Sequence, residues 1–464
     1  MAGLGHRVRR VTQGGVRLDH AIAAILLLGV CVAAIQQADI LLLVVAAPFI
    51  GAFLLVREST WDTVPLGQLT IPAFFIILYA ALMALPAMWM TPNLTEARYT
   101  YVAAVFSVLV ALPVGVLIAD QVFPQDRMVA RTFLSSVPPS DARAIPRATL
   151  YVSFLLGIAG LALYVYYSRG IPLLESMRGG GAGPSKVDLR FAENLLPESV
   201  QFAYEMSRRL LLPFAMLFAL LAWRVTARGS WLLAFLPLFA LSVIGSALAL
   251  DRAPAFTVVV MVLLASLVTQ GASVRRLIDG RVLALLAAAS VIGGFISIFQ
   301  YRGTFSVELL ANTAWYVATR RVFQDAAYMA SLTFSAYTDP STLLFGKSMR
   351  LLSYLGFESV PAPPSGFVAD LWRNFGWPGV VLGSVLLGFV MHTVQVKVFR
   401  VASIPTHALY VITIVGFAWL IYGNALGTVT TAVPALAIAG AALIGGWKHV
   451  RGTRRGRVAP SRST

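Results

Sequence analysis

Arginine is the residue type in this sequence that is best suited to chemistry, and much of it lies in two long stretches, 168–209 and 301–376. Only four of the 36 basic residues are lysine. A guanidinium group is planar, keeps its charge at any relevant pH and binds two phosphate oxygens at once. These stretches are therefore suited to bind a lipid-linked phosphate or diphosphate, although each cation could instead pair with an acid or reach to the surface. The cations are Arg169, Arg178, Lys186, Arg190, Arg208 and Arg209 in the first stretch, and Arg302, Arg320, Arg321, Lys347, Arg350 and Arg373 in the second.

Arg252 is the most sharply placed arginine. It follows Asp251 in a very short connection between two apolar segments. A charge at the end of a membrane helix is costly unless it is paired or functional. Two interpretations stay open: a local Asp251–Arg252 turn that faces lipid headgroups, or an Arg252 at the floor of an external binding site.

The composition predicts the elements that must position these residues. Hydrophobic residues make up 58% of the chain and charged residues 12%, and the mean hydropathy is +0.79. Soluble chains contain about 25% charged residues, so this composition predicts an all-α, polytopic membrane protein with a single integral membrane domain over 1–464. A spanning helix needs roughly 20 mostly apolar residues. Twelve windows meet this rule, at about 21–38, 39–56, 70–90, 101–119, 148–167, 210–225, 231–250, 253–270, 282–300, 377–396, 406–422 and 428–446.

The distribution of charge predicts the orientation. Cytoplasmic loops of membrane proteins collect Lys and Arg, and both the N-terminus and the basic tail 447–464 are rich in Arg. Twelve spans place both termini in the cytoplasm, with 22 basic and 7 acidic residues inside and 14 basic and 13 acidic residues outside. The net charge of +16 is then mainly a signal of topology and of attraction to anionic lipids, and nucleic-acid binding is not needed to explain it.

The two arginine-rich stretches are the long external loops of this topology. Long loops in compact proteins are usually functional or disordered. The run 179–185 (GGGAGPS) fits a flexible segment, whereas the second loop contains fourteen aromatic residues. We expect the second loop to fold onto the membrane surface, in part as short helices.

Histidine and cysteine do not predict a metal site. The single cysteine, Cys31, excludes an intrachain disulfide and a cysteine cluster. His6, His20, His407 and His449 lie at cytoplasmic ends, and His392 lies about 15 residues, or roughly 22 Å, below the external start of its span. We therefore expect neither a metal nor another cofactor.

Three local patterns resemble the O-antigen or oligosaccharide repeat-unit polymerases (Wzy-type). The segment 166–178 (YYSRGIPLLESMR) resembles the G-I-P-x-x…R entry to the first large loop of that family. The segment 245–252 (GSALALDR) resembles its G-S-R turn, although several residues separate Gly-Ser from Arg here. The segment 370–379 (DLWRNFGWPG) resembles its acidic-L-W/Y-x-x-F-G-x-x-G entry to a late span, and Gly376, Pro378 and Gly379 would also simply begin a helix at the membrane surface.

The resemblance implies a metal-independent glycosyltransferase of the bacterial cytoplasmic (inner) membrane. A growing glycan on undecaprenyl diphosphate would be transferred outside the membrane to a new lipid-linked repeat unit, in association with membrane lipids and a chain-length regulator. Charge would develop on the diphosphate leaving group, where cations stabilise it. The resemblance implies Arg178 and Arg252 as catalytic candidates, Arg190, Arg302, Arg320, Arg321 and Trp372 as substrate-binding candidates, and a carboxylate among Asp370, Glu308 and Asp325 as general base.

Three alternatives compete with this interpretation. A transporter or flippase of lipid-linked oligosaccharide also suits twelve spans, but its substrate path usually holds ionisable residues at mid-depth, and here the charges lie near the ends of the spans. A polyprenyl-phosphate-sugar-dependent GT-C glycosyltransferase would carry an acidic pair in the first external loop, which here holds only Asp39. An O-antigen ligase would be expected to use an external histidine.

Overall fold

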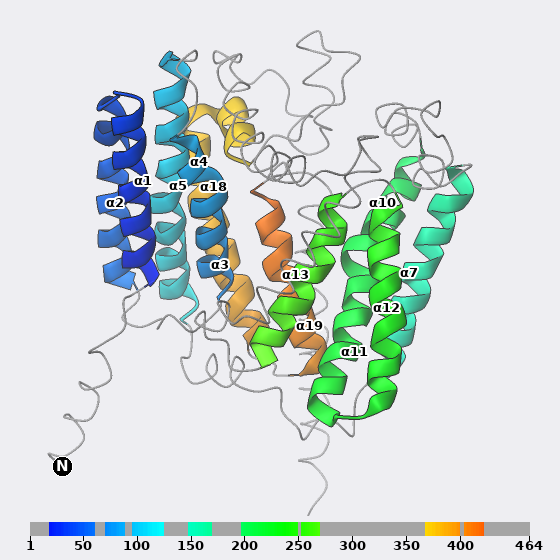
Figure 1. Ribbon diagram of the computed structural model, residues 1–464. Coiled ribbons are helices and arrows are strands. Elements are labelled where there is room, and N and C mark those ends of the chain that lie inside the picture. The colour runs from blue at the N-terminus through cyan, green and yellow to red at the C-terminus, as the bar shows by residue number, and fades with distance from the viewer. Residues whose placement is uncertain are drawn as a thin grey trace, which may run out of the picture.

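The computed structural model describes residues 18–60, 70–88, 95–124, 147–168, 196–248, 252–269, 367–399 and 403–421. Every regular element in these ranges is helical (Figure 1). Five helices are long and apolar enough to cross a membrane: Tyr99–Val122, Arg147–Tyr167, Ser199–Thr226, Gly229–Ser246 and Phe375–Phe399. These features are compatible with the predicted helical membrane bundle.

The helices coincide with ten of the twelve predicted windows. The remaining two, 282–300 and 428–446, lie outside the described residues, as do most of the two long loops and the tail 447–464. The elements are α1 (Leu18–Gln36), α2 (Leu41–Thr60), α3 (Ile71–Tyr79), the π-helix η1 (Ala80–Ala84), α4 (Leu85–Ala87), α5 (Thr95–Val122), α7 (Arg147–Tyr167), α10 (Glu198–Met206), the π-helix η4 (Ser207–Leu211), α11 (Leu212–Thr226), α12 (Gly229–Ala247), α13 (Arg252–Thr269), α18 (Phe367–Phe399) and α19 (Ile404–Trp419).

The helices run between two ends of the bundle, which we name the upper and lower rims after Figure 1. The upper rim holds the last residues of α1, α4, α7, α12 and α19 and the first residues of α2, α5, α10 and α13. The lower rim holds the first residues of α1, α3, α7, α12 and α19 and the last residues of α2, α5, α11, α13 and α18. The helices from α1 to α13 alternate in direction, apart from breaks within one span, and so do α18 and α19.

Local signals explain how two lower-rim helices begin. The hydroxyl of Thr70 accepts a hydrogen bond from the backbone N–H of Ala73, and Pro72 occupies the first turn of α3. Ser403 and Thr406 form a capping box at the start of α19. Gln395 near the end of α18 accepts a hydrogen bond from the backbone N–H of Ile71 at 2.9 Å, so the lower ends of α18 and α3 are joined.

Two glycines bring α5 and α18 into close contact. A Cβ atom on Gly115 would lie 1.9 Å from the carbonyl oxygen of Val385, and one on Gly388 would lie 2.1 Å from the carbonyl oxygen of Leu112. Each glycine therefore faces the backbone of the other helix. Small residues at such contacts permit the close packing that holds membrane helices together.

α18 is a hairpin of two helical segments that meet at Gly376. Gly376 has φ 64° and ψ −150°, a conformation that is open essentially to glycine alone. A Cβ on Gly383 would lie 2.6 Å from the side chain of Leu371, so the first segment folds back along the second. The sequence motif around Gly376 was open to interpretation as the start of a helix; in the structure, the helix starts at Phe367 and Gly376 turns it.

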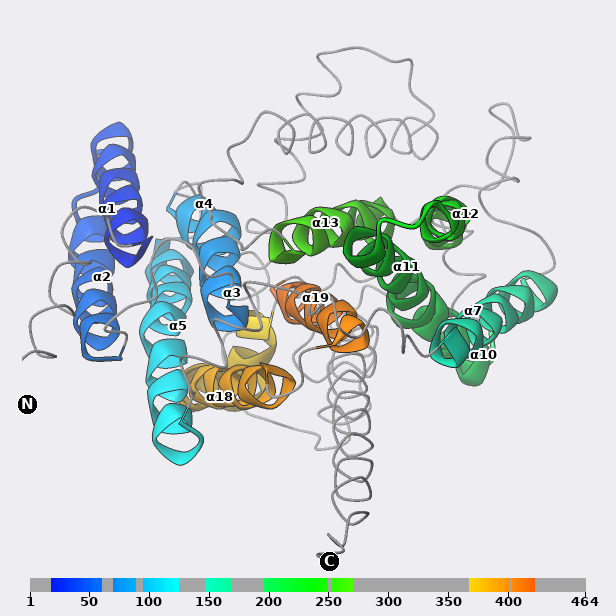
Figure 2. The same cartoon turned by 90° about the horizontal axis from the view of Figure 1, so that it is seen from below.

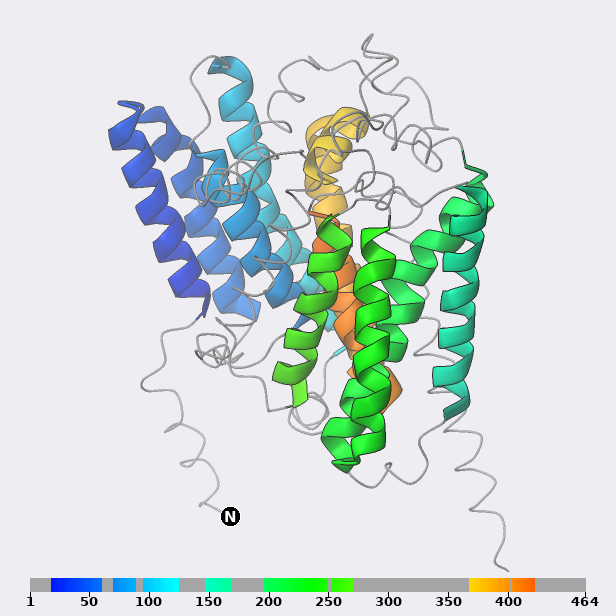
Figure 3. The same cartoon turned by 45° about the vertical axis from the view of Figure 1, so that its right-hand side comes forward.

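α19 lies between two groups of helices, as the view from below shows (Figure 2). The first group contains α1 to α5 and α18, and the second contains α7, α10, η4, α11, α12 and α13. α19 contacts α3 and α18 on one side and α11 and α13 on the other. The view in Figure 3 shows α19 behind α11 to α13 and below the first segment of α18.

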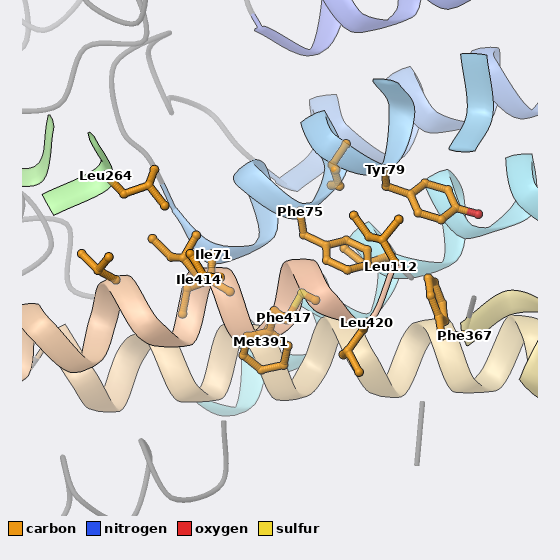
Figure 4. Packing of buried hydrophobic residues seen from close by; sticks show 14 of the residues in the cluster. Ile71, Phe75, Tyr79, Leu112, Leu264, Phe367, Met391, Ile414, Phe417 and Leu420 are labelled. Carbon is orange, nitrogen blue, oxygen red and sulfur yellow. The ribbon is translucent and has the colours of Figure 1, made fainter. Parts of the chain in front are cut away.

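The buried core continues through α19 from one group to the other. Phe75 and Tyr79 of α3 pack against Phe367 of α18, with ring centroids 5.9 and 5.8 Å from that of Phe367. Figure 4 shows these rings beside Leu420, near the upper end of α19, and Leu264 of α13 at the other end of the same cluster. The backbone N–H of Phe367 donates to the carbonyl of Leu420 at 3.3 Å, which fixes the start of α18 against the end of α19.

Candidate functional site at the upper rim

Three charged side chains gather within the helix that continues from α10 through η4 into α11. We name Glu205, Arg208 and Arg209 the upper ion cluster. Arg208 Nη2 contacts Glu205 Oε1, and Arg209 Nε lies 2.6 Å from Glu205 Oε2. These residues are three and four positions apart, which places them on one helix face. Each oxygen of one carboxylate thus contacts a different guanidinium group.

The cluster is largely buried, but unevenly. The side chains of Arg208, Glu205 and Arg209 are 4%, 16% and 19% exposed, respectively. Charged groups with so little exposure are stable only when they are paired. Arg208 is therefore held inside the protein, whereas Glu205 and Arg209 keep an accessible edge.

The backbone is widened at the two arginines. The π-helix η4 begins at Ser207, directly before Arg208. Single π-helical turns inside longer helices are rare and frequently occur at functional sites. The sequence window 210–225 ended below this turn because its charges counted against a span. In the structure the helix that contains this candidate span runs from Ser199 to Thr226 and includes the charges, which pair with one another.

A stack of aromatic rings supports Arg208. The guanidinium carbon of Arg208 lies 4.8 Å from the centroid of the Tyr204 ring, which stacks on Tyr164 of α7 with centroids 3.8 Å apart. The hydroxyl of Tyr204 donates to the carbonyl oxygen of Gly245 near the end of α12 at 2.9 Å. Arg208 is thus fixed relative to both α7 and α12.

Arg209 contacts the central helix instead. Its guanidinium carbon lies 4.8 Å from the centroid of Trp419, near the upper end of α19. A stacked guanidinium group uses its face for the ring and keeps its N–H groups, which point outward in its plane, for anions. Arg209 and Trp419 therefore form a contact between the second helix group and α19, with donors left at its edge.

Arg252 lies at the same rim as the cluster. It is the first residue of α13 and follows the end of α12, to which Tyr204 is bonded. The backbone of Arg252 thus lies at the upper rim, as the ion cluster does. Arg178 and Arg190, and likewise Arg302, Arg320 and Arg321, lie outside the described residues, so their predicted roles stay predictions.

Asp370 and Trp372 lie in the first segment of α18. Trp372 is buried, and its ring meets that of Trp377 at 5.0 Å in a T-shaped contact. The segment belongs to the upper part of the bundle, but on the side of the first helix group (Figure 3). The predicted roles of Asp370 as a base and Trp372 in binding a glycan stay predictions.

Sequence reasoning missed the partners that make the cluster. It named Arg208 and Arg209 only among the cations of the first loop, and it did not consider Glu205, Tyr204 or Trp419. The signal that could have found the pairing is the spacing of Glu205 to Arg208 and Arg209. Trp419 has no such signal, because its contact with Arg209 joins distant parts of the chain.

The described histidines lie away from the cluster. His392 Nε2 lies 3.2 Å from the carbonyl oxygen of Phe123 and 3.3 Å from Asp120 Oδ1 near the lower rim, and His407 lies in the first turn of α19. Within the part of the chain that the structure describes, no three His, Cys, Asp or Glu side chains gather as metal ligands would. No protein-family model, characterised protein or solved structure matches this chain.

Proposed function

We propose that this protein is an integral membrane glycosyltransferase that polymerises lipid-linked oligosaccharide repeat units on the external face of a bacterial cytoplasmic membrane. In this proposal the upper rim faces outward, the lower rim faces the cytoplasm, and the chain crosses the membrane twelve times. The donor and the acceptor are both glycans on undecaprenyl diphosphate. No nucleotide sugar takes part, and metal is not required.

The observation that carries the proposal is the upper ion cluster, at the rim where Arg252 begins α13. Transfer of the glycan breaks a sugar–diphosphate bond, so negative charge grows on the leaving diphosphate. Fixed guanidinium groups in a water-poor site stabilise such charge strongly. Arg208 and Arg209 supply two of these groups near the upper rim, where a lipid diphosphate would lie.

The connectivity supports a role for Arg178 and Arg190 at the same place. Their segment leaves the upper end of α7 after Ser168 and returns at Leu196, directly before α10. The Tyr164–Tyr204 stack holds α7, before this segment, against α10, after it. The segment that carries both arginines therefore begins and ends at the rim that holds the cluster.

The lower rim has the character of a cytoplasmic surface. The segment that joins α5 to α7 leaves and re-enters the bundle there, and it carries Arg127, Arg131 and Arg143. Arg224 and Arg228 lie at the turn between α11 and α12. Basic residues in short connections favour the cytoplasmic side, which agrees with the proposed orientation.

One observation favours a second function, the movement of lipid-linked oligosaccharide across the membrane. Arg209 lies eleven residues after Glu198, or about 16 Å along the helix, and the helix Ser199–Thr226, which is long and apolar enough to cross a membrane, contains the whole cluster. Ionisable residues inside a span often line a substrate path. The sequence predicted that the charges lie near the ends of the spans, which argued against a transporter. The ion cluster lies well inside a longer helix, so this argument against a transporter is weaker.

Reconstitution distinguishes the two functions. The full chain is placed in liposomes with an undecaprenyl-diphosphate-linked repeat unit in both leaflets. Polymerisation predicts a ladder of longer lipid-linked glycans on gels, whereas a flippase predicts exchange of single units between leaflets without lengthening. Exchange without a ladder, with glycan units from the native host, would contradict the polymerase proposal.

A further inference from the structure

We propose that Glu205 is an exchangeable counter-ion of the upper ion cluster, and that Arg209 is the cation that takes up a phosphate-bearing lipid headgroup in its place. The ligand chemistry is a phosphate or diphosphate that approaches from the upper rim. The inference rests on the proposed function only for the identity of that lipid as undecaprenyl diphosphate. Arg208 is the fixed, inner arginine of the same site.

The carboxylate of Glu205 already occupies an anion site. Its two oxygens contact two different guanidinium groups, Oε1 that of Arg208 and Oε2 that of Arg209. A phosphate group offers two oxygens on one central atom in the same way and carries more negative charge. The contacts made by Glu205 therefore outline the position that a phosphate would take.

Charge in the cluster favours the exchange. One carboxylate faces two guanidinium groups, so these three side chains together carry a net charge of +1. A diphosphate brings at least two negative charges and forms stronger charge-assisted hydrogen bonds than a single carboxylate. The Glu205 side chain that it replaces is 16% exposed, and its flexible stem allows the carboxylate to turn away.

The two arginines differ in their freedom to take part. Arg208 is almost fully buried, and the Tyr204 ring against which it lies is itself fixed by Tyr164 and by the Gly245 carbonyl. Arg209 is more exposed and rests on Trp419 by its face. An incoming anion therefore meets Arg209 first, while Arg208 holds the inner end of the site in place.

Trp419 provides a reporter for the exchange. An anion at Arg209 changes the charge above the Trp419 ring, and indole emission is sensitive to nearby charge. The chain has nine tryptophans, so the signal of Trp419 is the difference between the wild-type chain and Trp419→Phe. This difference reports binding at the cluster rather than elsewhere.

The test measures binding of inorganic pyrophosphate to the full chain in phosphatidylcholine nanodiscs, by calorimetry and by Trp419 emission. Removing the competing carboxylate in Glu205→Gln should tighten binding at least about tenfold, and Arg209→Ala should weaken it at least about tenfold, the factor expected when one charge-assisted contact changes. Arg209→Lys should fall between, because it loses the planar fork. Arg224→Ala is the matched control, since Arg224 lies 5.7 Å from the Trp223 ring at the opposite rim, and it should bind as the wild-type chain does.

The results that overturn the inference are equally specific. Equal affinity of Glu205→Gln and the wild-type chain would show that Glu205 does not compete, and unchanged binding by Arg209→Ala would place the site elsewhere. If Glu205→Gln does not fold, Arg209→Ala and the Trp419 signal still decide. Competition by undecaprenyl diphosphate alone would identify the polyprenyl lipid, competition by phosphatidylglycerol as well would identify a general headgroup site, and competition by neither would overturn the inference.

Failure of the proposed function would look different. The binding experiment contains no glycan, so it succeeds or fails independently of glycan transfer. Pyrophosphate binding at Arg209 without polymerisation would contradict the proposed function but not the replacement of Glu205 by a phosphate. Polymerisation by the wild-type chain, together with unchanged pyrophosphate binding by Arg209→Ala, would do the opposite.

Discussion

Gly160 of α7 lies directly against Ser207, the first residue of the π-helix η4. A Cβ atom on Gly160 would be 2.0 Å from Ser207 Oγ and 2.7 Å from the carbonyl oxygen of Ala203, and Ser207 Oγ already donates to that carbonyl at 2.8 Å. This contact sets the distance at which Tyr164, one turn further along α7, can stack on Tyr204. The absence of a side chain at Gly160 thereby allows the Tyr164–Tyr204 stack, against which Arg208 lies, to form.

We predict that Gly160→Ala separates α7 from η4 and weakens the Tyr164–Tyr204 stack. Overpacking of a tight contact costs about 1–3 kcal/mol, so the thermal transition of the purified protein should fall and glycan transfer should decrease with it. Gly51→Ala in α2 is the control, because a Cβ there meets no atom within 4 Å. Equal stability of the two variants would contradict the role of Gly160.

We predict that Gly388→Ala destabilises the protein without a direct effect on the ion cluster. The new methyl group would collide with the Leu112 carbonyl of α5, and backbone cannot move aside as easily as a side chain. Unfolding by denaturant in detergent should show a loss of at least about 1–3 kcal/mol. Pyrophosphate affinity of the fraction that remains folded should match that of the wild-type chain; a lower affinity would mean that the α5–α18 contact also shapes the site.

We predict that Gly376→Ala disrupts the hairpin of α18. An alanine at φ 64° and ψ −150° is strained by about 1–3 kcal/mol or more, so the first segment should separate from the second. Cysteine cross-linking between positions 371 and 383 measures this separation in a Cys31→Ser background. Cross-linking as efficient as in the parent protein would show that the segment tolerates alanine.

We predict that Arg252→Ala and Arg178→Ala abolish long-chain glycan while single lipid-linked units persist. Both replacements remove a cation that the proposed mechanism places near the leaving diphosphate, and loss of one such group costs about 10²–10³ in rate. Glycan ladders from cells that lack the native gene measure the effect, with protein level checked by immunoblot. Arg7→Ala combined with Arg9→Ala is the control and should polymerise normally, because many other basic residues fix the orientation.

The sequence predicted the helices better than it predicted their contacts. Apolar runs long enough to span a membrane are local features, and all ten predicted windows that fall on described residues contain helices. The break at Gly376 was not predicted, since Gly-Trp-Pro-Gly also suits the first turn of a helix. The contact of Arg209 with Trp419 could not be predicted from spacing, because it depends on how α11 and α19 pack.

The pairing of charges in the upper ion cluster also could not be predicted by counting charges along the sequence. Glu205, Arg208 and Arg209 each argue against a membrane span when they are counted singly. Together they neutralise one another in part, and the helix continues through them. A count of charges has no information about pairing, so the predicted window began at residue 210, directly after the cluster.

The central position of α19 has a consequence for how the protein is made. Synthesis proceeds from the N-terminus, so ribosomes finish all helices of both groups before Ile404, the first residue of α19, is added. The surfaces that α19 covers on α3, α11 and α13 must remain inserted in the lipid until then. Docking of the two groups, and with it the contact of Trp419 with Arg209, is therefore a late step of biogenesis. A chain truncated before α19 would be inserted in the membrane but not assembled.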